Sequence, residues 1–468
     1  MNFEGVIKNE YRVLQTIGEI ADEMKVQVRA IGGFVRDLIL KRKNEDIDIV
    51  CLCDCTTFVN VIAEKLHITE VAIYKNYGTA MIKFENLQLE FVTARKESYD
   101  HSSRNPIVQP ATFLEDELRR DFTINTLAIS LNNENFGELI DDMNGVVDLE
   151  NKIIKTTTDP DITFDDDPLR MLRAIRFSTQ LDFTIEPHTF FSIRKFAERI
   201  KIISQERITT ELNKILLSPR PSVGFELLRN TGLLKIILPC VENLRGRIHI
   251  GNFSHKDVYF HSLQVLDGVA KKSDKLFLRW AGLLHDIAKP ATKRFDPVNG
   301  FSFHGHEEIG ARMIKEIFSR LKISKKDTEY VMKLTRLHLR PIVIAQECTS
   351  DSGIRRLAFE AGEDLEDLMI LCRADITSQN LDKIKKYMNN FDIVEKKILM
   401  VKEKDFIRNL QPVITGEMIM KELNIPPSPV IGVIKSRLKQ AIIDNEIENT
   451  YEANYDLMQK ILKELKLK

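Results

Sequence analysis

The sequence predicts an α+β protein in which a small α/β head is followed by a long helical body. Two observations carry this prediction. Up to about residue 155, segments rich in β-branched residues alternate with segments whose apolar residues recur at helical spacing. Beyond about residue 160 the strand signals nearly vanish and amphipathic helical patterns continue. We therefore expect a head (1–155), a helical neck (156–240), a third helical domain (241–380) and a helical tail (381–468).

The individual elements follow from local pattern. Strands are expected at 46–53, 79–95 and 124–130, where β-branched residues are bounded by turn formers, and helices at 10–24 and 56–66 of the head. The neck and body carry amphipathic helices, of which the clearest are 169–181, 207–217, 277–289 and 364–376. Turn-rich segments at 297–301 and 424–432 interrupt the helical body.

Length and composition limit the classes of protein to consider. Of the 468 residues, 43% are hydrophobic and 29% are charged, which is close to globular averages and excludes long disorder. No stretch approaches the roughly eighteen apolar residues of a membrane span, and no secretory signal is expected at the N-terminus. The net charge of −1 excludes a globally basic nucleic-acid coat but allows a local basic groove.

The cysteines indicate a reducing compartment. Six in a chain of this length form no disulfide framework, so we expect a cytoplasmic protein. Cys51, Cys53 and Cys55 alternate, so on a strand they would share one face and pack there. Metal binding by the three thiols is the alternative.

Two signals of phosphate chemistry lie close together in the head. The pair Gly32-Gly33 precedes a helical pattern, where backbone N–H groups can approach a phosphate and Arg36 can add a charge-assisted contact. Asp46 and Asp48 project from one face of an expected strand. Two carboxylates about 4 Å apart repel by roughly 4 kcal/mol at an effective dielectric of 20, which favours a cation between them, and oxygen ligands suit Mg²⁺. Taken alone, an ordinary turn and two solvated carboxylates explain both signals.

Four further motifs follow in order: RRDFTIN (119–125), DDMNGVVDL (141–149), DDPLRMLRAIRF (166–177) and ERITTELNKIL (206–216). With the two head signals they make the chain, over about residues 30–235, resemble the class II tRNA nucleotidyltransferases (CCA-adding enzymes) and their bacterial poly(A) polymerase relatives. The resemblance implies a polymerase-β-like nucleotidyltransferase head on a helical neck, body and tail. It also implies that Asp46 and Asp48 bind the catalytic Mg²⁺ ions.

The resemblance assigns nucleotide contacts to one set of residues in the head and neck. These are Gly32, Gly33, Arg36, Arg120, Asp121, Asn125, Asp167, Arg170, Arg173 and Arg176. Within the RRD motif that begins at Arg119, Asp121 is expected to contact a ribose hydroxyl. Enzymes of this superfamily usually have a third carboxylate on a neighbouring strand, and Glu90 is the best-placed candidate. An ordinary exposed strand glutamate is the alternative for Glu90.

The neck motif offers a way to select bases without a nucleic-acid template. Asp167 and Arg170 are three apart and would share a helix face, which alone fits a solvated ion-pair stripe. The resemblance identifies residues 166–170 as the EDxxR motif, with Asp166 where glutamate is usual. A carboxylate accepts from the exocyclic amine of C or A while a guanidinium donates to the adjacent acceptor. U and G would leave these groups unpaired.

Histidines cluster in the third helical domain. Seven of the ten lie within 90 residues: His249, His255, His261, His285, His304, His306 and His338. The order His261, His285-Asp286 and Asp375 resembles the HD-domain metal phosphohydrolases, and His306 and His338 are the candidates for further ligands of a binuclear site. The resemblance implies a divalent metal of unknown identity that could support phosphate-ester hydrolysis. A degenerate domain with packed histidines is the alternative.

The leading hypothesis is therefore an enzyme that adds C and A to the tRNA 3′ end from CTP and ATP, with release of pyrophosphate. The expected partners are tRNA and the two nucleotides, with no membrane and no obligate protein partner. Poly(A) polymerase and a partial CC- or A-adding enzyme share the head motifs. Alternatives of other classes are an HD nucleotide phosphohydrolase with a nucleotide-sensing head and a non-catalytic RNA-binding scaffold. Basic helices such as 433–441 could follow a phosphate backbone.

Overall fold

The computed structural model describes residues 1–74, 78–100, 103–250, 253–346, 351–377, 380–409, 411–444 and 446–465. It divides into two compact units, which are described separately. The first unit comprises residues 1–338 with 370–377, and the second comprises 339–369 with 378–468. Among the described residues, no helix is both long enough and apolar enough to span a membrane.

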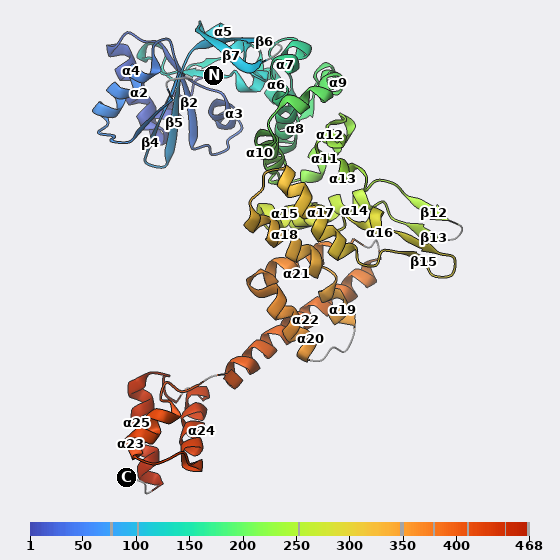
Figure 1. Cartoon of the computed structure of the whole chain (residues 1–468). Coiled ribbons are helices and arrows are strands. Elements are labelled where there is room, and N and C mark those ends of the chain that lie inside the picture. Colours follow the sequence, from blue (N-terminus) through green and yellow to red (C-terminus); the bar gives the residue numbers. More distant parts are fainter. Residues whose placement is uncertain are drawn as a thin grey trace. The chain divides into compact units, whose positions relative to one another are not determined.

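The head is built on one seven-stranded sheet in the order β3-β4-β5-β2-β1-β8-β9 (Figure 1). Its strands are β1 (Val28–Ile31), β2 (Asp46–Cys51), β3 (Val71–Tyr74), β4 (Thr79–Phe84), β5 (Leu87–Thr93), β8 (Ala128–Ser130) and β9 (Leu139–Ile140). All neighbours are antiparallel except β2 and β5, which run parallel. The strands expected at 46–53 and 79–95 are present, the second as two strands. Of the third expected strand, only β8 forms, because residues 123–125 are a 3-10 turn.

The other head elements flank this sheet or extend from it. They are α1 (Glu4–Glu10), α2 (Arg12–Glu23), α3 (Gly33–Ile39), α4 (Cys55–Lys65), the separate pair β6 (Arg95–Asp100) and β7 (Ser103–Pro110), α5 (Phe113–Leu118) and α6 (Gly145–Glu150). Apolar side chains from β1, β2 and β8 pack with Phe113 of α5 in one buried cluster. One face of the sheet is thus packed with buried apolar side chains, which hold its strands together.

The expectation for the cysteines is wrong in one respect. Strand β2 ends at Cys51, because the Asp54 side chain accepts hydrogen bonds from the backbone N–H groups of Thr56 and Thr57 and starts α4. Cys55 is therefore the first residue of a helix, and the three cysteines do not share a strand face. The five cysteines within the described ranges all have free thiols.

The neck is helical, as expected. It contains α7 (Pro160–Asp166), α8 (Leu169–Leu181), α9 (Pro187–Phe196), α10 (Gln205–Leu216), α11 (Pro221–Asn230), α12 (Leu233–Ile237) and α13 (Pro239–Glu242), with one short parallel pair of β10 (Ile153–Ile154) and β11 (Thr184–Ile185). The amphipathic helices α8 and α10 pack against each other.

The rest of the first unit is a helical domain from which two short hairpins project. Its helices are α14 (Val258–Ala270), α15 (Leu276–Leu284), α16 (Lys289–Thr292), α17 (His306–Arg320) and α18 (Lys325–Leu337). The hairpins pair β12 (Ile248–Ile250) with β13 (Phe253–His255), and β14 (Arg294–Asp296) with β15 (Gly300–Ser302). Neither hairpin was expected, since three-residue strands lie below what a residue pattern resolves.

A buried arginine joins the neck to this domain. Arg279 of α15 is 2% exposed, and its Nη1 donates to the carbonyls of Leu216 (2.8 Å) and Ser218 (2.9 Å), at the end of α10. Its Nη2 donates to the carbonyl of Ala270 at the end of α14 (3.3 Å). One guanidinium thus supplies donors to carbonyls that two helix ends leave unpaired.

The second unit is entirely helical within its described residues. It contains α19 (Arg340–Gln346), α20 (Asp351–Ala361), the long helix α22 (Leu381–Asn409) and a three-helix bundle, while α21 (Leu365–Ala374) ends in the first unit. The bundle consists of α23 (Gly416–Leu423), α24 (Pro429–Ile443) and α25 (Tyr451–Glu464), and it has its own core of eight buried apolar side chains. The overall fold class is confirmed, whereas the boundaries expected for the four parts stay a prediction.

Candidate active site and metal centre

The expected carboxylates lie side by side on the head sheet. Ile47 and Ile49 are buried on the opposite face of β2, so Asp46 and Asp48 project from the other face. In the register between β2 and β5, Asp48 lies directly beside Glu90. The structure thus brings all three predicted carboxylates to one patch.

Electrostatics at this patch favour a cation. Burial raises the pKa of Asp48 to about 6; Arg120 opposes the rise, while Glu90 and Asp46 add to it. The ionised carboxylate is thus poorly compensated by the protein's own charges. A divalent cation would supply the missing positive charge, and hard oxygen donors suit Mg²⁺.

The glycine loop lies against these carboxylates. Gly32 has a φ of +84°, and a Cβ added there would lie 3.5 Å from Asp48 Oδ2 and 3.4 Å from Arg120 Nη1. A Cβ at position 32 would thus touch both groups at van der Waals distance, and the positive φ would strain any residue other than glycine. Gly33 begins α3, so the chain turns away from the sheet directly after this contact.

A buried acid that the sequence analysis missed orients the RRD motif. Asp116 is 1% exposed, and its carboxylate binds both Arg119 (2.5 Å) and Arg120 (3.0 Å). The spacing of three and four residues to an arginine pair was the available signal. Because Asp116 holds the Arg120 guanidinium beside Gly32 and Asp48, it controls where that charge lies.

A chain of side-chain hydrogen bonds connects the head to the neck. Arg36 Nη1 donates to Asn125 Oδ1 (2.8 Å), and Asn125 Nδ2 donates to Asp121 Oδ1 (3.0 Å). Asp121 Oδ2 then accepts from Arg173 Nε on α8 (2.6 Å). Arg36 also pairs with Asp37 (2.9 Å). The contacts that Arg36 and Asp121 make here are to protein, and the nucleotide contacts expected of both stay a prediction.

The neck motif differs from the expected helix face. Asp167 is not helical: it follows α7 and precedes Pro168, and the residue before a proline is disfavoured in the helical region. Its Oδ1 accepts from the backbone N–H of Leu169 (3.1 Å), and its Oδ2 from Arg207 Nη2 (3.2 Å). Arg170 lies on α8 and donates to the Arg119 carbonyl (2.7 Å), beside the RRD motif.

The Arg176 side chain is buried in the neck. It is 6% exposed and pairs with buried Glu211 of α10 (3.0 Å), and burial lowers its pKa to about 10. Its partner is thus a neck side chain, and the nucleotide contact expected of Arg176 stays a prediction.

All six predicted residues of the histidine-rich domain converge on one cluster. Each of the four histidines has its Nδ1 held: His261 by Thr377 Oγ1 (2.9 Å), and the others by backbone carbonyls at 2.6–2.9 Å, which are those of Gly282, Phe303 and Thr335. The carbonyls can only accept, so Nδ1 donates in His285, His306 and His338, and all four rings present Nε2 to the interior of the cluster. Outer contacts of this kind orient the histidine ligands of metals.

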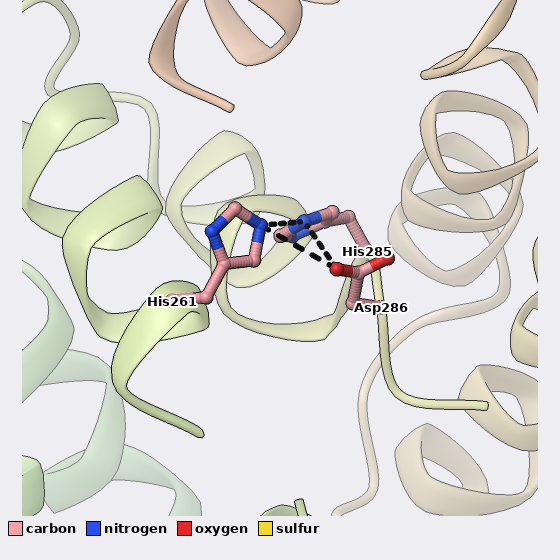
Figure 2. A group of neighbouring side chains, drawn as sticks. All are labelled: His261, His285 and Asp286. Atoms are coloured by element: carbon pink, nitrogen blue, oxygen red, sulfur yellow. Dashed lines mark hydrogen bonds and ion pairs between the residues drawn. The ribbon is translucent and has the colours of Figure 1, made fainter. Parts of the chain in front are cut away.

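Asp286 divides this cluster into two ligand groups. Its Oδ2 lies 3.4 Å from His261 Nε2 and 3.2 Å from His285 Nε2 (Figure 2). Its Oδ1 lies 3.4 Å from His306 Nε2 and 3.9 Å from His338 Nε2. Each group can hold a metal ion, so one carboxylate would serve both.

Two further residues complete the cluster. Asp375 Oδ1 lies 2.9 Å from His261 Nε2 and 3.5 Å from His285 Nε2. Lys289, which the sequence analysis missed, places its Nζ 2.6 Å from Asp286 Oδ2. Although burial disfavours the charged imidazole, Asp286 and Asp375 raise the pKa of His285 to about 10. The positive charges of Lys289 and His285 therefore neutralise these two carboxylates in part, as a bound cation would.

Fold and site together define a nucleotidyltransferase head of the polymerase type joined to an HD domain. Sequence models agree on this class. The poly(A) polymerase head domain matches residues 28–155, a probable RNA and SrmB-binding site of polymerase A matches 182–244, and an HD domain matches 258–380.

Individual relatives cover most of the chain. The A-adding tRNA nucleotidyltransferase of Deinococcus radiodurans is 32% identical over 355 residues, which are 73% of this chain and 78% of the relative. The multifunctional CCA protein of Vibrio parahaemolyticus is 30% identical over 363 residues, 75% of this chain and 85% of the relative. Among solved structures, the Thermotoga maritima CCA-adding enzyme complexed with tRNA has a TM-score of 0.59 at 21% identity, covering 96% of this chain and 95% of that one.

Two other relatives are much longer than this chain. The A-adding enzymes of Geobacter sulfurreducens and Aquifex aeolicus are both 34% identical to it, but the matched region spans only 29% and 26% of their lengths. The chain belongs to the tRNA nucleotidyltransferase and bacterial poly(A) polymerase family, with an HD domain. It is a nucleotidyltransferase.

Proposed function

We propose that this protein adds C and A to the 3′ end of tRNA from CTP and ATP, without a nucleic-acid template. The observation that carries the proposal is the patch formed by Asp46, Asp48 and Glu90 beside Gly32 and Arg120. The names of the relatives supply the substrate class.

In the proposed reaction the tRNA 3′-hydroxyl oxygen attacks the α-phosphorus of the nucleotide. A new phosphodiester bond forms as the hydroxyl loses its proton to solvent, the bond between the α-phosphorus and the bridging oxygen breaks, and pyrophosphate leaves with that electron pair. Asp46 and Asp48 would hold Mg²⁺, which lowers the pKa of the hydroxyl and neutralises charge on the entering and leaving oxygens. Arg120, held by Asp116, adds a fixed positive charge at the same edge.

Asp167 and Arg170 are the proposed base-reading pair. Asp167 would accept from the exocyclic amine of C or A, and Arg170 would donate to the neighbouring acceptor. The two side chains have different partners in the protein: Asp167 forms an ion pair with Arg207, and Arg170 donates a hydrogen bond to the Arg119 carbonyl. Since that carbonyl belongs to the RRD motif, Arg170 is connected to the head, where the triphosphate would bind.

A second candidate function is A addition alone. The relatives at 32–34% identity are named A-adding enzymes, and those named for CCA are 24–30% identical. A partner enzyme would then add the two C residues first. Poly(A) polymerase activity is a third version of the same chemistry, distinguished by a longer product.

One experiment separates these versions. The protein is incubated with tRNA ending before the CCA, or ending in CC, with labelled CTP, ATP or both, and the product ends are read. CCA addition extends both tRNAs, by three and by one nucleotide. A-adding activity extends only the second, and a poly(A) product exceeds three nucleotides. The double variant Asp46→Asn/Asp48→Asn should extend neither, and extension at the normal rate would refute the head site.

The HD cluster is proposed to bind divalent metal and to hydrolyse a phosphate ester. His261, His285 and Asp286 would hold one ion, and Asp286, His306 and His338 a second; Asp375 would join the first. Metal analysis of purified protein tests this, with Asp286→Asn as the control.

The free thiols of the described cysteines support a cytoplasmic location.

A further inference from the structure

The two hairpins of the HD domain carry positive charge that the protein does not neutralise. Residues 245–256 contain three Arg or Lys and no Asp or Glu, and residues 293–304 contain two against one. The hairpin cations are Arg245, Arg247, Lys256, Lys293 and Arg294. All five are exposed, and none forms an ion pair with any residue of the described ranges.

One acid directly follows the first hairpin and one lies within the second, and both accept hydrogen bonds from backbone N–H groups. Asp257 accepts from the N–H groups of Tyr259 and Phe260 at the start of α14, and from that of Gly246. Asp296 accepts from Val298 and Asn299 in its turn. Among the described residues neither carboxylate forms an ion pair with a hairpin cation, so these cations remain available to an outside anion.

The hairpins form one surface. Strand β13 lies next to β15, and Figure 1 shows the two hairpins side by side on one side of the HD domain. Ile248 pairs with His255 at the base of the first hairpin, and Arg247 and Lys256 are the residues directly before and after this pair in the sequence. Arg294 opposes Ser302 at the base of the second. The charges therefore gather where both hairpins leave the helical domain.

Both bases lead directly into the metal-ligand cluster. The first hairpin continues into α14, which carries His261, and Lys256 Nζ donates to the carbonyl of Thr377, the residue that holds His261 (3.3 Å). The second hairpin continues to Phe303, whose carbonyl holds His306. A polyanion on this surface is thus close to the cluster in the fold.

The accessible edge of the cluster lies on the same side. The side chains of His261 and Asp375 are each 14% exposed, whereas those of His285, Asp286 and His338 are at most 1% exposed. A substrate phosphate must approach past His261, beside Lys256. Two partly exposed aromatic rings lie close to these charges in the sequence: Phe260, in the first turn of α14 after the first hairpin, is 45% exposed, and Phe295, next to Arg294 on β14, is 38% exposed. One side of each ring contacts a neighbouring ring, that of Tyr259 or Phe301.

We propose that the hairpin cations bind single-stranded RNA and present its end to the exposed edge of the HD cluster. The cations would contact phosphates, and Phe260 and Phe295 would stack on unpaired bases, which a duplex does not offer. This surface lies beyond residues 182–244, which match the RNA-binding model, and on a different domain from the nucleotidyltransferase head. The proposal does not depend on which nucleotides the head adds.

The test compares two triple variants of the full chain. The hairpin variant is Arg247→Gln/Lys293→Gln/Arg294→Gln, which spares Lys256 because it contacts Thr377. The control is Lys315→Gln/Lys325→Gln/Lys326→Gln, which removes three exposed charges from α17 and α18 of the same domain. The probe is a fluorescein-labelled, unstructured 12-nucleotide RNA, with a 12-base-pair RNA duplex alongside.

We expect the hairpin variant to bind the single strand at least tenfold more weakly at low salt, with the control unchanged. Its slope of log K against log salt should fall by about 2, as three lost phosphate contacts require for a single strand. Equal affinity of the two variants overturns the proposal. So does an equal loss for the duplex, which would reveal a non-specific polyanion surface.

Cross-linking of the unaltered protein gives a second, independent test. The same RNA carrying 4-thiouridine should cross-link to peptides within 245–260 or 293–304. Cross-links confined to the head, neck or tail would refute the proposal even if the hairpin variant failed to fold.

Discussion

Asp48 and Glu90 lie directly opposite each other across the one parallel strand pair of the head sheet. Their side chains share a face because residues in register on neighbouring strands project the same way. Like charges in this arrangement destabilise the sheet unless a cation neutralises them. The pairing therefore selects Glu90, rather than another head glutamate, as the third carboxylate of the proposed site.

Glu90→Gln should reduce nucleotide addition at least tenfold while leaving the melting temperature equal or higher. The amide keeps the shape of the side chain but removes one of the charges that raise the pKa of Asp48. Glu64→Gln, the same change at an exposed position on α4 of the head, is the matched control and should add nucleotides normally. Full activity of Glu90→Gln would make Glu90 an ordinary strand residue.

Arg170→Ala should weaken the selection among the four nucleotides without abolishing nucleotide addition. Losing a charged donor costs about 1.5–3 kcal/mol, or ten- to hundredfold in kcat/KM, and the loss should fall on the favoured bases. UTP and GTP never made that hydrogen bond, so their use should fall less or rise. Arg194→Ala, on exposed α9, is the control. A uniform drop for all four nucleotides would show that Arg170 only supports the Arg119 carbonyl.

Asp286→Asn should separate the two domains functionally. Metal content and any phosphohydrolase activity should be lost, because both ligand groups use this carboxylate. Nucleotide addition should stay within several-fold of the unaltered protein, measured alongside the melting temperature. Loss of both activities in a folded variant would contradict two independent sites.

Glu117 gives the head a predictable pH dependence. Burial raises the pKa of Glu117 to about 7; Asp142 adds to the rise, and Arg29 (3.2 Å) opposes it. Since the folded pKa exceeds the unfolded value near 4.5, this group's contribution to stability is complete below about pH 4.5 and is lost as pH rises through about 7. The melting temperature of Glu117→Gln minus that of the unaltered protein should therefore increase from pH 5 to pH 8. A difference that does not change with pH would show that Glu117 does not titrate in this range.

Local sequence was sufficient where one pattern decides the outcome. The alternation around Asp46 and Asp48 predicted their shared face, because Ile47 and Ile49 can only be buried on the other side. The ordered motif from His261 to Asp375 identified a cluster whose six members do meet. Neither pattern says which side chains lie next to each other in space. Only the structure shows that Glu90 is the neighbour of Asp48 and that Asp286 lies between the two ligand groups.

Local sequence misled where a short-range interaction overrode periodicity. Pro168 kept Asp167 out of the helix that its spacing to Arg170 suggested, and the Asp54 cap ended the cysteine strand. Asp116 and Lys289 were missed for another reason. An acid close to two arginines, or a lysine close to an acid, is common on protein surfaces. Only the burial of Asp116 and Asp286 distinguishes these contacts from ordinary surface ion pairs.

The guanidinium of Arg279 makes the neck and the HD domain mechanically continuous. A rotation of α10 relative to α14 would break the hydrogen bonds from Arg279 to one of the two helix ends and leave donors of a guanidinium that is 2% exposed unsatisfied. The neck's last long helix and the first HD helices should therefore move as one body. Any hinge that opens the base-reading site has to lie on the head side of α10, where the contacts are those of Asp121 with Arg173 and of Arg119 with Arg170.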